Sequence, residues 1–202
     1  MIRKYRIFRL SQLSERFTDN ELYNYSLQNM DFNHCTCPNC GDEGSLKKHA
    51  SYRRYLIGDK NGIPEDSFVE VTRFMCISCN TTHSYIPVFM IPFSVYSLRF
   101  VLKVLLCYFQ RKFTVINICD KFGISVSALY KWIHIFKKCQ EVWICALQEL
   151  LMLPGQLNGS FYMDSTSISK PDEFINYINQ DGVFLENYQH LFGKSFLENI
   201  LF

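Results

Sequence analysis

The chain of 202 residues is 48% hydrophobic, 16% aromatic and 20% charged, which is typical of a folded protein with an apolar core and excludes an intrinsically disordered chain. Its net charge of +2 is unevenly distributed. Residues 1–98 hold 11 Lys/Arg and 10 Asp/Glu (+1), residues 99–138 hold 8 and 1 (+7), and residues 139–202 hold 2 and 8 (−6), which sum to +2. The positive charge of residues 99–138 indicates a surface for phosphate groups, and the acidic end excludes a second surface of that kind.

The sequence gives no sign of export or of a membrane span. The start, MIRKYRIFRL, lacks an apolar stretch followed by a cleavage site. Residues 74–98 carry no formal charge, but polar residues and two prolines, Pro87 and Pro92, interrupt them. The nine cysteines include two CxxC pairs, which favours metal thiolates in a reducing compartment over disulfides. We therefore expect a cytoplasmic protein without membrane partners.

Residues 1–30 are expected to form a strand and a helix that pack against the rest of the chain. In the stretch FTDNELYNYSLQNM, Thr18 and Glu21 have the spacing of a capping box, which predicts a helix start. An alternative function for this segment is a DNA-contacting arm built from its basic residues, Arg3, Lys4, Arg6 and Arg9.

Four cysteines in residues 31–92 have the spacing of a metal site. Cys37 and Cys40 belong to a CPNCG turn, in which Gly41 relieves the backbone, and Cys76 and Cys79 follow after 35 residues. Two such turns supply the four corners of a tetrahedron. We therefore predict one structural Zn²⁺ held by these four thiolates, with no open position for water and hence no catalytic metal.

Other residues near the paired cysteines remain alternative ligands. Cys35 is a possible replacement for Cys37, although its spacing to Cys40 is less usual. Three histidines are possible nitrogen ligands: His34, His49 and His83. A further alternative is that the cysteines are small buried apolar residues without a metal.

The two cysteine pairs are separated by stretches with strand patterns. We expect strands in the stretches LKKHASYRRYLI and SFVEVTRFM, and a turn between them at Lys60-Asn61-Gly62. Together with the cysteines they predict a zinc ribbon of short antiparallel strands, followed by an extended, proline-containing connector up to residue 92. The fold class is therefore expected to be α+β, with a mainly helical second part.

Residues 93–153 carry the pattern of three helices. Ser94 or Ser97 can cap the first, whose apolar stripe is Leu98, Val101, Leu102, Leu105 and Phe109. The stretch FTVINICDKFGISVSALYKWIHIFKK, residues 113–138, then reads as a helix-turn-helix. Thr114 and Ser125 are expected to cap its two helices, and Gly123 allows the turn. Ile118, Phe122, Leu129, Ile133 and Phe136 are expected to face inward, with the small Cys119 allowing the helices to approach closely.

The exposed side of the second helix is the candidate DNA-reading surface. We expect Tyr130, Lys131 and Trp132 to face a groove, with Ala128 beside them. The candidate phosphate contacts are Arg111, Lys112, Lys131, Lys137 and Lys138. The candidate base contacts are Ser127, Tyr130 and His134, and Ser125 belongs to the same surface. The alternative is a helical corner that does not bind DNA. The positive charge of residues 99–138 favours DNA binding.

The second helix is expected to continue to Leu153, because no proline or glycine interrupts it before Pro154-Gly155. Its residues 129–150 carry an apolar seam with steps of four and three, which indicates either a homodimer through a coiled coil or a helix packed against the chain's own C-terminal segment. Both alternatives remain open.

Residues 154–202 form an acidic, aromatic segment that we expect to be folded but to which we assign no chemistry. The stretch NGSFYMDSTSI includes a candidate strand, and Ser169-Lys170-Pro171-Asp172 predicts a helix start with proline in the first turn. Gly182 and Gly193 mark two further short helices.

With these motifs, residues 30–140 resemble the N-terminal region of insertion-sequence transposases, in which a four-cysteine zinc ribbon precedes a helix-turn-helix. They resemble more closely a family of small uncharacterised bacterial proteins that keep both elements without the nuclease. The resemblance implies a bacterial, nucleoid-associated protein that binds double-stranded DNA and is linked to mobile elements.

The expected function is therefore DNA recognition without catalysis. A transposase nuclease needs three carboxylates that hold two metal ions. Asp164 has the sequence context of the first of them, but only 38 residues follow it. Two alternatives remain: a truncated or split transposase subunit that needs a partner for catalysis, and a protein-interaction module using the aromatic C-terminal segment.

Overall fold

A computed structural model of the chain describes residues 17–60, 63–87, 89–152 and 170–180. The chain divides into two compact units, made mainly of Leu13–Leu98 and of Arg99–Phe202. The division into four segments predicted from the sequence remains a prediction. Several expectations lie outside the described residues: the strand and the basic arm (Arg3, Lys4, Arg6, Arg9) at the start of the chain, the strand in residues 158–168, Asp164, the helix end at Pro154-Gly155, and the helices near Gly182 and Gly193.

The first described element is α2, Asp19–Gln28, and it begins with the predicted capping box. The Thr18 side chain accepts a hydrogen bond from the Glu21 backbone N–H (3.2 Å), and the Glu21 carboxylate accepts one from the Thr18 backbone N–H (2.7 Å). The helix buries Leu22 and Tyr23. The Tyr23 hydroxyl accepts a hydrogen bond from the Thr72 backbone N–H (2.7 Å), which fixes α2 to the sheet.

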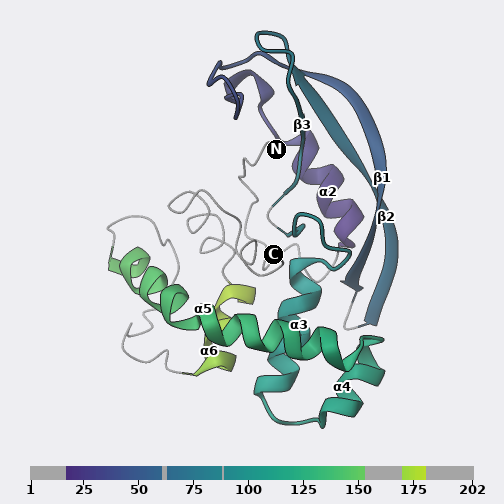
Figure 1. The fold of residues 1–202 in the computed structure, drawn as a ribbon, viewed down its shortest axis with the longest axis vertical. Helices are drawn as coiled ribbons and strands as arrows, with labels where there is room; N and C mark the ends of the chain where they lie inside the picture. The colour runs from purple at the N-terminus through teal and green to yellow at the C-terminus, as the bar shows by residue number, and fades with distance from the viewer. Residues whose placement is uncertain (1–16, 61–62, 88, 153–169, 181–202) are drawn as a thin grey trace. The chain divides into compact units, whose positions relative to one another are not determined.

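The sheet has three antiparallel strands in the order β1-β2-β3 (Figure 1). Strand β1, Leu46–Lys60, pairs with β2, Ile63–Cys76, along its whole length, from Leu46 opposite Cys76 to Lys60 opposite Ile63. The predicted Lys60-Asn61-Gly62 turn includes residues 61–62, which lie outside the described residues. Strand β3, Thr82–Ser84, pairs with residues 73–75 of β2. The predicted α+β class is confirmed, although the two main strands are longer than the short strands expected, because they support each other through the full ladder.

The ladder contains one irregularity, a register shift between Lys48 and Ala50 that leaves His49 as a bulge. Beyond it, side chains alternate between two faces. Leu56, Val69 and Val71 are buried on one face. On the other face the Arg53 guanidinium lies 4.3 Å from the centre of the exposed Phe68 ring, which the Tyr55 ring also contacts. The hairpin therefore has a core face and a solvent face.

The connector between β3 and the helical part packs along β1. The Ile57 backbone N–H donates to the Val95 carbonyl (2.6 Å), and the Ser97 N–H donates to the Ile57 carbonyl (2.9 Å). The half-buried Arg54 guanidinium donates to the carbonyls of Ile91 and Ser94. The connector is not extended throughout as expected, because the Met90 N–H donates to the Pro87 carbonyl (2.9 Å) and the Ser94 N–H donates to the Ile91 carbonyl (3.2 Å), which makes two turns. Backbone and arginine hydrogen bonds hold it to β1.

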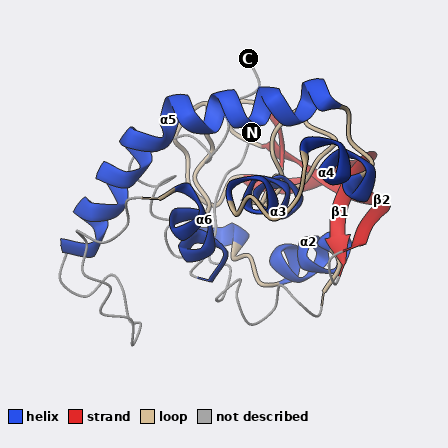
Figure 2. Cartoon of the chain, turned by 90° about the horizontal axis from the view of Figure 1, so that it is seen from below, coloured by secondary structure: helices blue, strands red, loops and turns tan. Residues whose placement is uncertain are grey.

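The second unit contains three successive helices, α3 (Leu98–Phe109), α4 (Val115–Phe122) and α5 (Val126–Met152) (Figure 2). Aromatic rings lie between them. The fully buried Phe100 of α3 contacts Phe122 of α4 at 5.8 Å and Trp132 of α5 at 6.4 Å between ring centres. Phe109 of α3 contacts Phe136 of α5 at 5.0 Å. The two contacts of Phe100 are edge-to-face and that of Phe109 is tilted, and such ring contacts hold the helices together.

The predicted caps and turn of α4 and α5 are confirmed. Thr114 accepts a hydrogen bond from the Asn117 backbone N–H (3.3 Å), and Ser125 accepts one from Ala128 (3.2 Å). Gly123 ends α4 with a φ of 60°. Because this left-handed conformation strains residues with a Cβ, glycine suits the turn.

The last described helix is α6, Pro171–Gln180, which begins at the expected proline. The Glu173 carboxylate accepts a hydrogen bond from the Lys170 backbone N–H (3.3 Å), which is half of a capping box. Phe174 of α6 stacks on Trp143 and contacts Phe136, both on α5. These contacts within one chain support the alternative in which the apolar stripe of α5 packs against the C-terminal segment.

In the part of the chain that the structure describes, no helix combines the length and the apolar character that a membrane crossing needs.

Candidate metal centre and basic helix face

The four predicted cysteines lie together at one end of the hairpin. The sulfur atoms of Cys37, Cys40, Cys76 and Cys79 all lie within 4.8 Å of one another. The Cys37–Cys79 sulfur distance is 3.7 Å and the Cys40–Cys76 distance is 3.6 Å. A tetrahedral zinc with metal–sulfur bonds of about 2.3 Å places its sulfur ligands about 3.8 Å apart. These residues can therefore hold a metal ion, and their spacing fits tetrahedral coordination.

The first cysteine pair is held in a tight turn by backbone hydrogen bonds. The Gly41 N–H donates to the Cys37 carbonyl (2.9 Å), and the Cys37 N–H donates to the Asp42 carbonyl (2.8 Å). Gly41 has a φ of 77°. The Asn39 N–H points at the Cys37 sulfur at 3.4 Å. The turn thus directs both sulfur atoms to the same side.

The second cysteine pair repeats this turn. The Asn80 N–H donates to the Cys76 carbonyl (2.9 Å), and the Cys76 N–H donates to the Thr81 carbonyl (3.0 Å). Asn80 takes the place of the glycine, with a φ of 55°. Asparagine tolerates this conformation better than most residues with a Cβ.

Hydrogen bonds outside the sulfur cluster also join the two turns. The Ser78 hydroxyl donates to the Asp42 carboxylate, and the Asn39 amide donates to the Thr81 hydroxyl (3.3 Å). The Ile77 backbone N–H donates to the Ser45 carbonyl (3.0 Å). Because the β1–β2 register places Leu46 opposite Cys76, the hairpin itself brings the second turn back to the first.

Polar neighbours shift the pKa values of the thiols in opposite directions. Hydrogen bonds from the Thr81 hydroxyl and backbone, and from Asn39, lower the pKa of Cys79 to about 6. A hydrogen bond from Ser45 lowers the pKa of Cys76. The Asp42 backbone lowers the pKa of Cys40, but desolvation and the other three sulfur atoms outweigh it and raise the pKa to about 12. Because thiolates this close repel one another, full ionisation of the cluster favours a bound cation.

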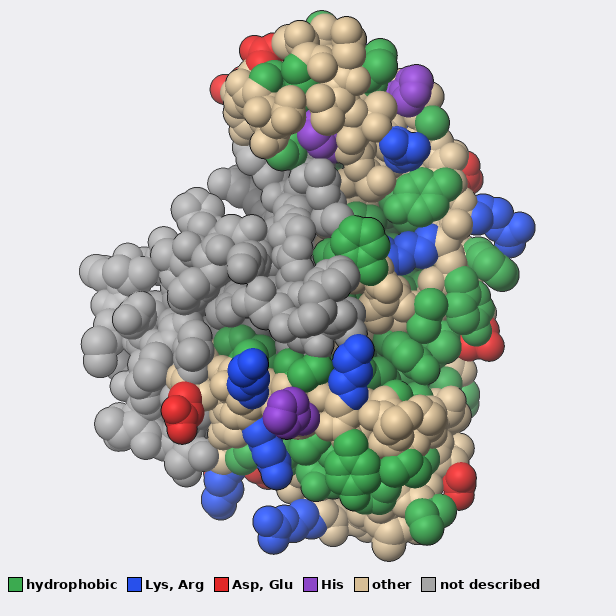
Figure 3. Space-filling view, in the orientation of Figure 1, with side chains coloured by type: hydrophobic (Ala, Val, Ile, Leu, Met, Phe, Trp, Pro, Cys, Tyr) green, Lys and Arg blue, Asp and Glu red, His purple; other side chains and the backbone are tan. Residues whose placement is uncertain are grey.

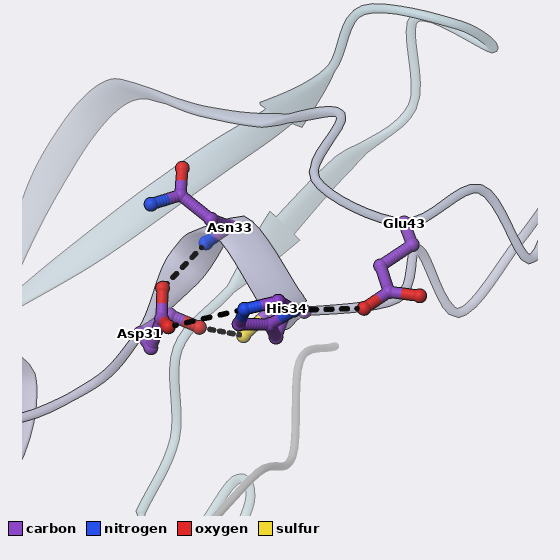
Figure 4. A network of polar contacts seen from close by, with 5 residues as sticks. Asp31, Asn33, His34 and Glu43 are labelled. Carbon is purple, nitrogen blue, oxygen red and sulfur yellow. Dashed lines mark hydrogen bonds and ion pairs between the residues drawn. The ribbon is translucent and has the colours of Figure 1, made fainter.

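The alternative ligands lie in other environments. The Cys35 thiol donates to the Asp31 carbonyl (3.1 Å), outside the cluster. The exposed His34 ring lies between the carboxylates of Glu43 (3.2 Å) and Asp31 (3.7 Å), as Figure 4 shows. His49 is exposed at the bulge of β1. His83 lies against the cluster, with its Nε2 atom 3.3 Å from the Cys37 sulfur.

The second candidate site is the exposed face of α5. At about 100° per residue, its candidate DNA contacts fall within about one third of the helix circumference. They are all exposed: Ser127, Tyr130, Lys131, His134, Lys137 and Lys138. Lysine and arginine side chains gather with a histidine on the face of this unit seen in Figure 3. The buried stripe of Leu129, Ile133 and Phe136 lies on the opposite side of the helix.

The expectation that Trp132 faces a DNA groove is wrong. Only 4% of Trp132 is exposed, and its ring packs against Phe100. The helical period explains this position, since Trp132 lies beside the Leu129 and Ile133 stripe and away from Lys131. Tyr130 is half exposed, and Ala128 is partly buried.

The loop between α3 and α4 adds further positive charge. Arg111 and Lys112 are exposed, as predicted for phosphate contacts, and Arg111 has a φ of 56°. The Lys121 ammonium lies 5.1 Å from the centre of the Phe113 ring, which is partly exposed. Lys121 was missed in the choice of basic candidates, although its place in the last turn of α4 was visible from the sequence.

In the comparison with known proteins, a family model described as Domain of unknown function (DUF6431) matches residues 37–132, which are 96 of the 202 residues. The matched stretch begins at the first cysteine of the cluster and ends on α5. No curated protein and no solved structure matches the chain. The match agrees with the predicted likeness to an uncharacterised family, and the likeness to transposases remains a prediction.

Proposed function

We propose that this protein is a zinc-stabilised, sequence-directed DNA-binding protein in which α4 and α5 act as a helix-turn-helix. The observation that carries the proposal is the amphipathic character of α5. Lys131, Lys137 and Lys138 lie with His134 on its exposed face, opposite the aromatic core. A surface of this kind suits the phosphates and base edges of a DNA groove.

Each side chain on this face has a proposed role. Phosphates are neutralised by Lys131, Lys137 and Lys138 of α5 and by Arg111 and Lys112 of the loop between α3 and α4. These contacts position the helix on the DNA. Ser127, Tyr130 and His134 contact base edges, while Ser125 fixes the helix start through the Ala128 N–H. The acidic Glu141, exposed one turn beyond Lys137 and Lys138, limits the surface at its C-terminal side.

The cysteine cluster has a structural role in this proposal. One Zn²⁺ bound by Cys37, Cys40, Cys76 and Cys79 joins two turns that are distant in sequence, and its binding energy stabilises the fold of the first unit. With four sulfur ligands it has no open position for a substrate, so the metal acts on structure. We place the protein in the bacterial cytoplasm, at the nucleoid, in a process linked to mobile elements.

A salt titration tests DNA binding. Fluorescence anisotropy with a labelled duplex should show binding at low salt and an affinity that falls as salt rises, with a slope that reports the number of neutralised phosphates. Absence of binding at low salt, or binding that is independent of salt, contradicts the proposal.

The variant Lys131→Glu tests the surface itself. It should weaken binding to every duplex sequence and reduce the salt slope by about 1, because it removes one phosphate contact. The matched control is Lys47→Glu, an equal change of charge at an exposed position of β1. If both variants weaken binding equally, the contact surface does not lie on α5.

Homodimerisation through residues 129–150 remains a separate proposal. Phe136 and Trp143 of this stretch are buried against Phe174 of the same chain, so a dimer has to use other side chains or displace α6. Analytical ultracentrifugation across a range of concentrations distinguishes monomer from dimer.

A further inference from the structure

The cysteine cluster has an inner and an outer pair of residues. Cys37 and Cys76 are 2% and 0% exposed, whereas Cys79 is half-buried and Cys40 is exposed. Each inner cysteine has a polar side chain against its sulfur atom. His83 of β3 lies 3.3 Å from the Cys37 sulfur, and the Ser45 hydroxyl lies 3.1 Å from the Cys76 sulfur.

This arrangement matches the demands of buried thiolates. Four thiolates around a divalent cation leave a net negative charge, which is costly where water is excluded. An N–H or O–H donor directed at a buried sulfur offsets that cost. Cys40 and Cys79 have access to water, and Cys79 also has donors in Thr81 and Asn39, whereas the buried Cys37 and Cys76 depend on donors from the protein alone.

His83 is buried in this position by the sheet. It is 5% exposed and lies in the middle of β3, where its backbone pairs with Phe74 of β2. A metal-bound thiolate has no proton and only accepts hydrogen bonds, so the Nε2 atom that faces Cys37 has to carry the hydrogen. The structure therefore selects one tautomer of His83 when a metal is bound.

The geometry argues against His83 as a ligand. Among the described residues, the candidate ligand atoms that lie within 4.8 Å of one another in this cluster are the four sulfur atoms, and His83 is not among them. Two sulfur–sulfur distances, 3.7 and 3.6 Å, already fit a four-sulfur tetrahedron. The His83 imidazole thus contacts the Cys37 sulfur without being one of the four ligands.

We propose that His83 is a positioning residue of the metal centre, whose Nε2–H donates to the Cys37 thiolate and holds that sulfur in place for the metal. This inference rests on the metal site of the proposed function and is independent of DNA binding. Partners that orient metal ligands in this way typically contribute 10- to 100-fold to metal affinity, about the effect expected here.

The test uses the full chain with Co²⁺ and Zn²⁺ as probes, in competition with a chelator. His83→Ala should lower the affinity for both ions by about 10- to 100-fold. Its Co²⁺-loaded form should keep the sulfur-to-metal charge-transfer intensity of four thiolates, because no ligand is lost. His83→Gln, whose amide can also donate a hydrogen bond, should recover much of the affinity. The matched control His49→Ala changes an exposed histidine of β1 and should leave the affinity unchanged.

The outcomes separate this inference from the metal proposal itself. If the wild-type chain binds neither ion, the proposed metal site and the positioning role of His83 are both wrong. If the wild type binds but His83→Ala binds equally well, the positioning role alone is wrong. A Co²⁺ spectrum of His83→Ala with one ligand fewer shows that His83 is itself a ligand, which also overturns the inference. If His83→Ala does not fold, as judged by circular dichroism, His83→Gln carries the test, and a loss as large as about 100-fold contradicts the donor role.

Discussion

The two candidate sites are built in different ways. In the cysteine cluster, each half is a turn of six residues whose geometry comes from its own backbone hydrogen bonds, Cys37 to Asp42 and Cys76 to Thr81. On α5, the exposed face exists because a ring cluster from three other helices buries the opposite side, with Phe100 and Phe174 as contacts. The metal site therefore depends on a few residues and an ion, while the basic face depends on the packing of a whole unit.

The largest effect is expected for the loss of one buried ligand. Cys76→Ser should abolish stoichiometric metal binding and unfold the first unit, because the binding energy of a structural metal is folding energy. Mass spectrometry under native conditions and thermal unfolding measure the two effects. Cys35→Ser is the matched control, since Cys35 is equally buried but lies outside the cluster. A metal-free Cys76→Ser protein that unfolds like the wild type contradicts the structural role.

In the helical unit, the substitution expected to destabilise the fold is that of its central ring, Phe100. Phe100→Ala removes the contacts with Phe122 and Trp132 that join α3 to α4 and α5, and should lower the free energy of unfolding by about 3–5 kcal/mol. Chemical denaturation followed by circular dichroism measures the change. Phe113→Ala, at a partly exposed ring of the same unit, should have a much smaller effect. Equal losses in the two variants contradict the central place of Phe100.

A smaller effect concerns the pH dependence of the first unit. Burial raises the pKa of Tyr85 to about 12, above its ordinary value of 10.0. Between these two values the unfolded chain ionises and the folded chain does not, so stability is lost as pH rises, by about 1.4 kcal/mol for each pH unit, and does not fall further above the folded value. Denaturant unfolding of the wild type and of Tyr85→Phe from pH 9 to 12 measures this difference. If the free energies of unfolding of the two proteins change in parallel with pH, Tyr85 does not contribute to the pH dependence.

The smallest effect separates stability from DNA binding on the helical unit. Arg111 has a left-handed backbone, which costs a residue with a Cβ about 1 kcal/mol. Arg111→Gly should therefore keep or raise the free energy of unfolding, by up to about 1 kcal/mol, while DNA affinity falls because a phosphate contact is lost. Lys112→Gly is the control, since Lys112 has no positive φ and its replacement should not stabilise the unit. A gain in DNA affinity for Arg111→Gly contradicts the contact.

Local signals in the sequence were sufficient for the caps, the turns and the four cysteines. The Thr18–Glu21 box, the Thr114 and Ser125 caps and the left-handed Gly123 each depend on residues within a few positions of one another. The CxxC spacing also contains the whole geometry of each half of the metal site. This is why these features could be predicted from the chain alone.

Contacts between distant segments were not predictable in the same way. Strand β3 is three residues long and is a strand only because β2 lies beside it. The place of His83 against Cys37 depends on that pairing, as the place of Ser45 depends on the β1–β2 register. Trp132 is a different case, because the helical period already placed it beside the buried stripe.

The bulge at His49 links the length of the hairpin to the cysteine cluster. Strand β1 has 15 residues and β2 has 14, and the unpaired His49 accounts for the difference. Deleting one residue from β2 alone displaces Cys76 along the strand by about 3.3 Å and reverses the faces of the side chains beyond the deletion. Deleting two facing residues, such as Asp59 and Pro64, keeps the register. Change in the length of this hairpin is therefore tolerated in matched pairs and not in single steps.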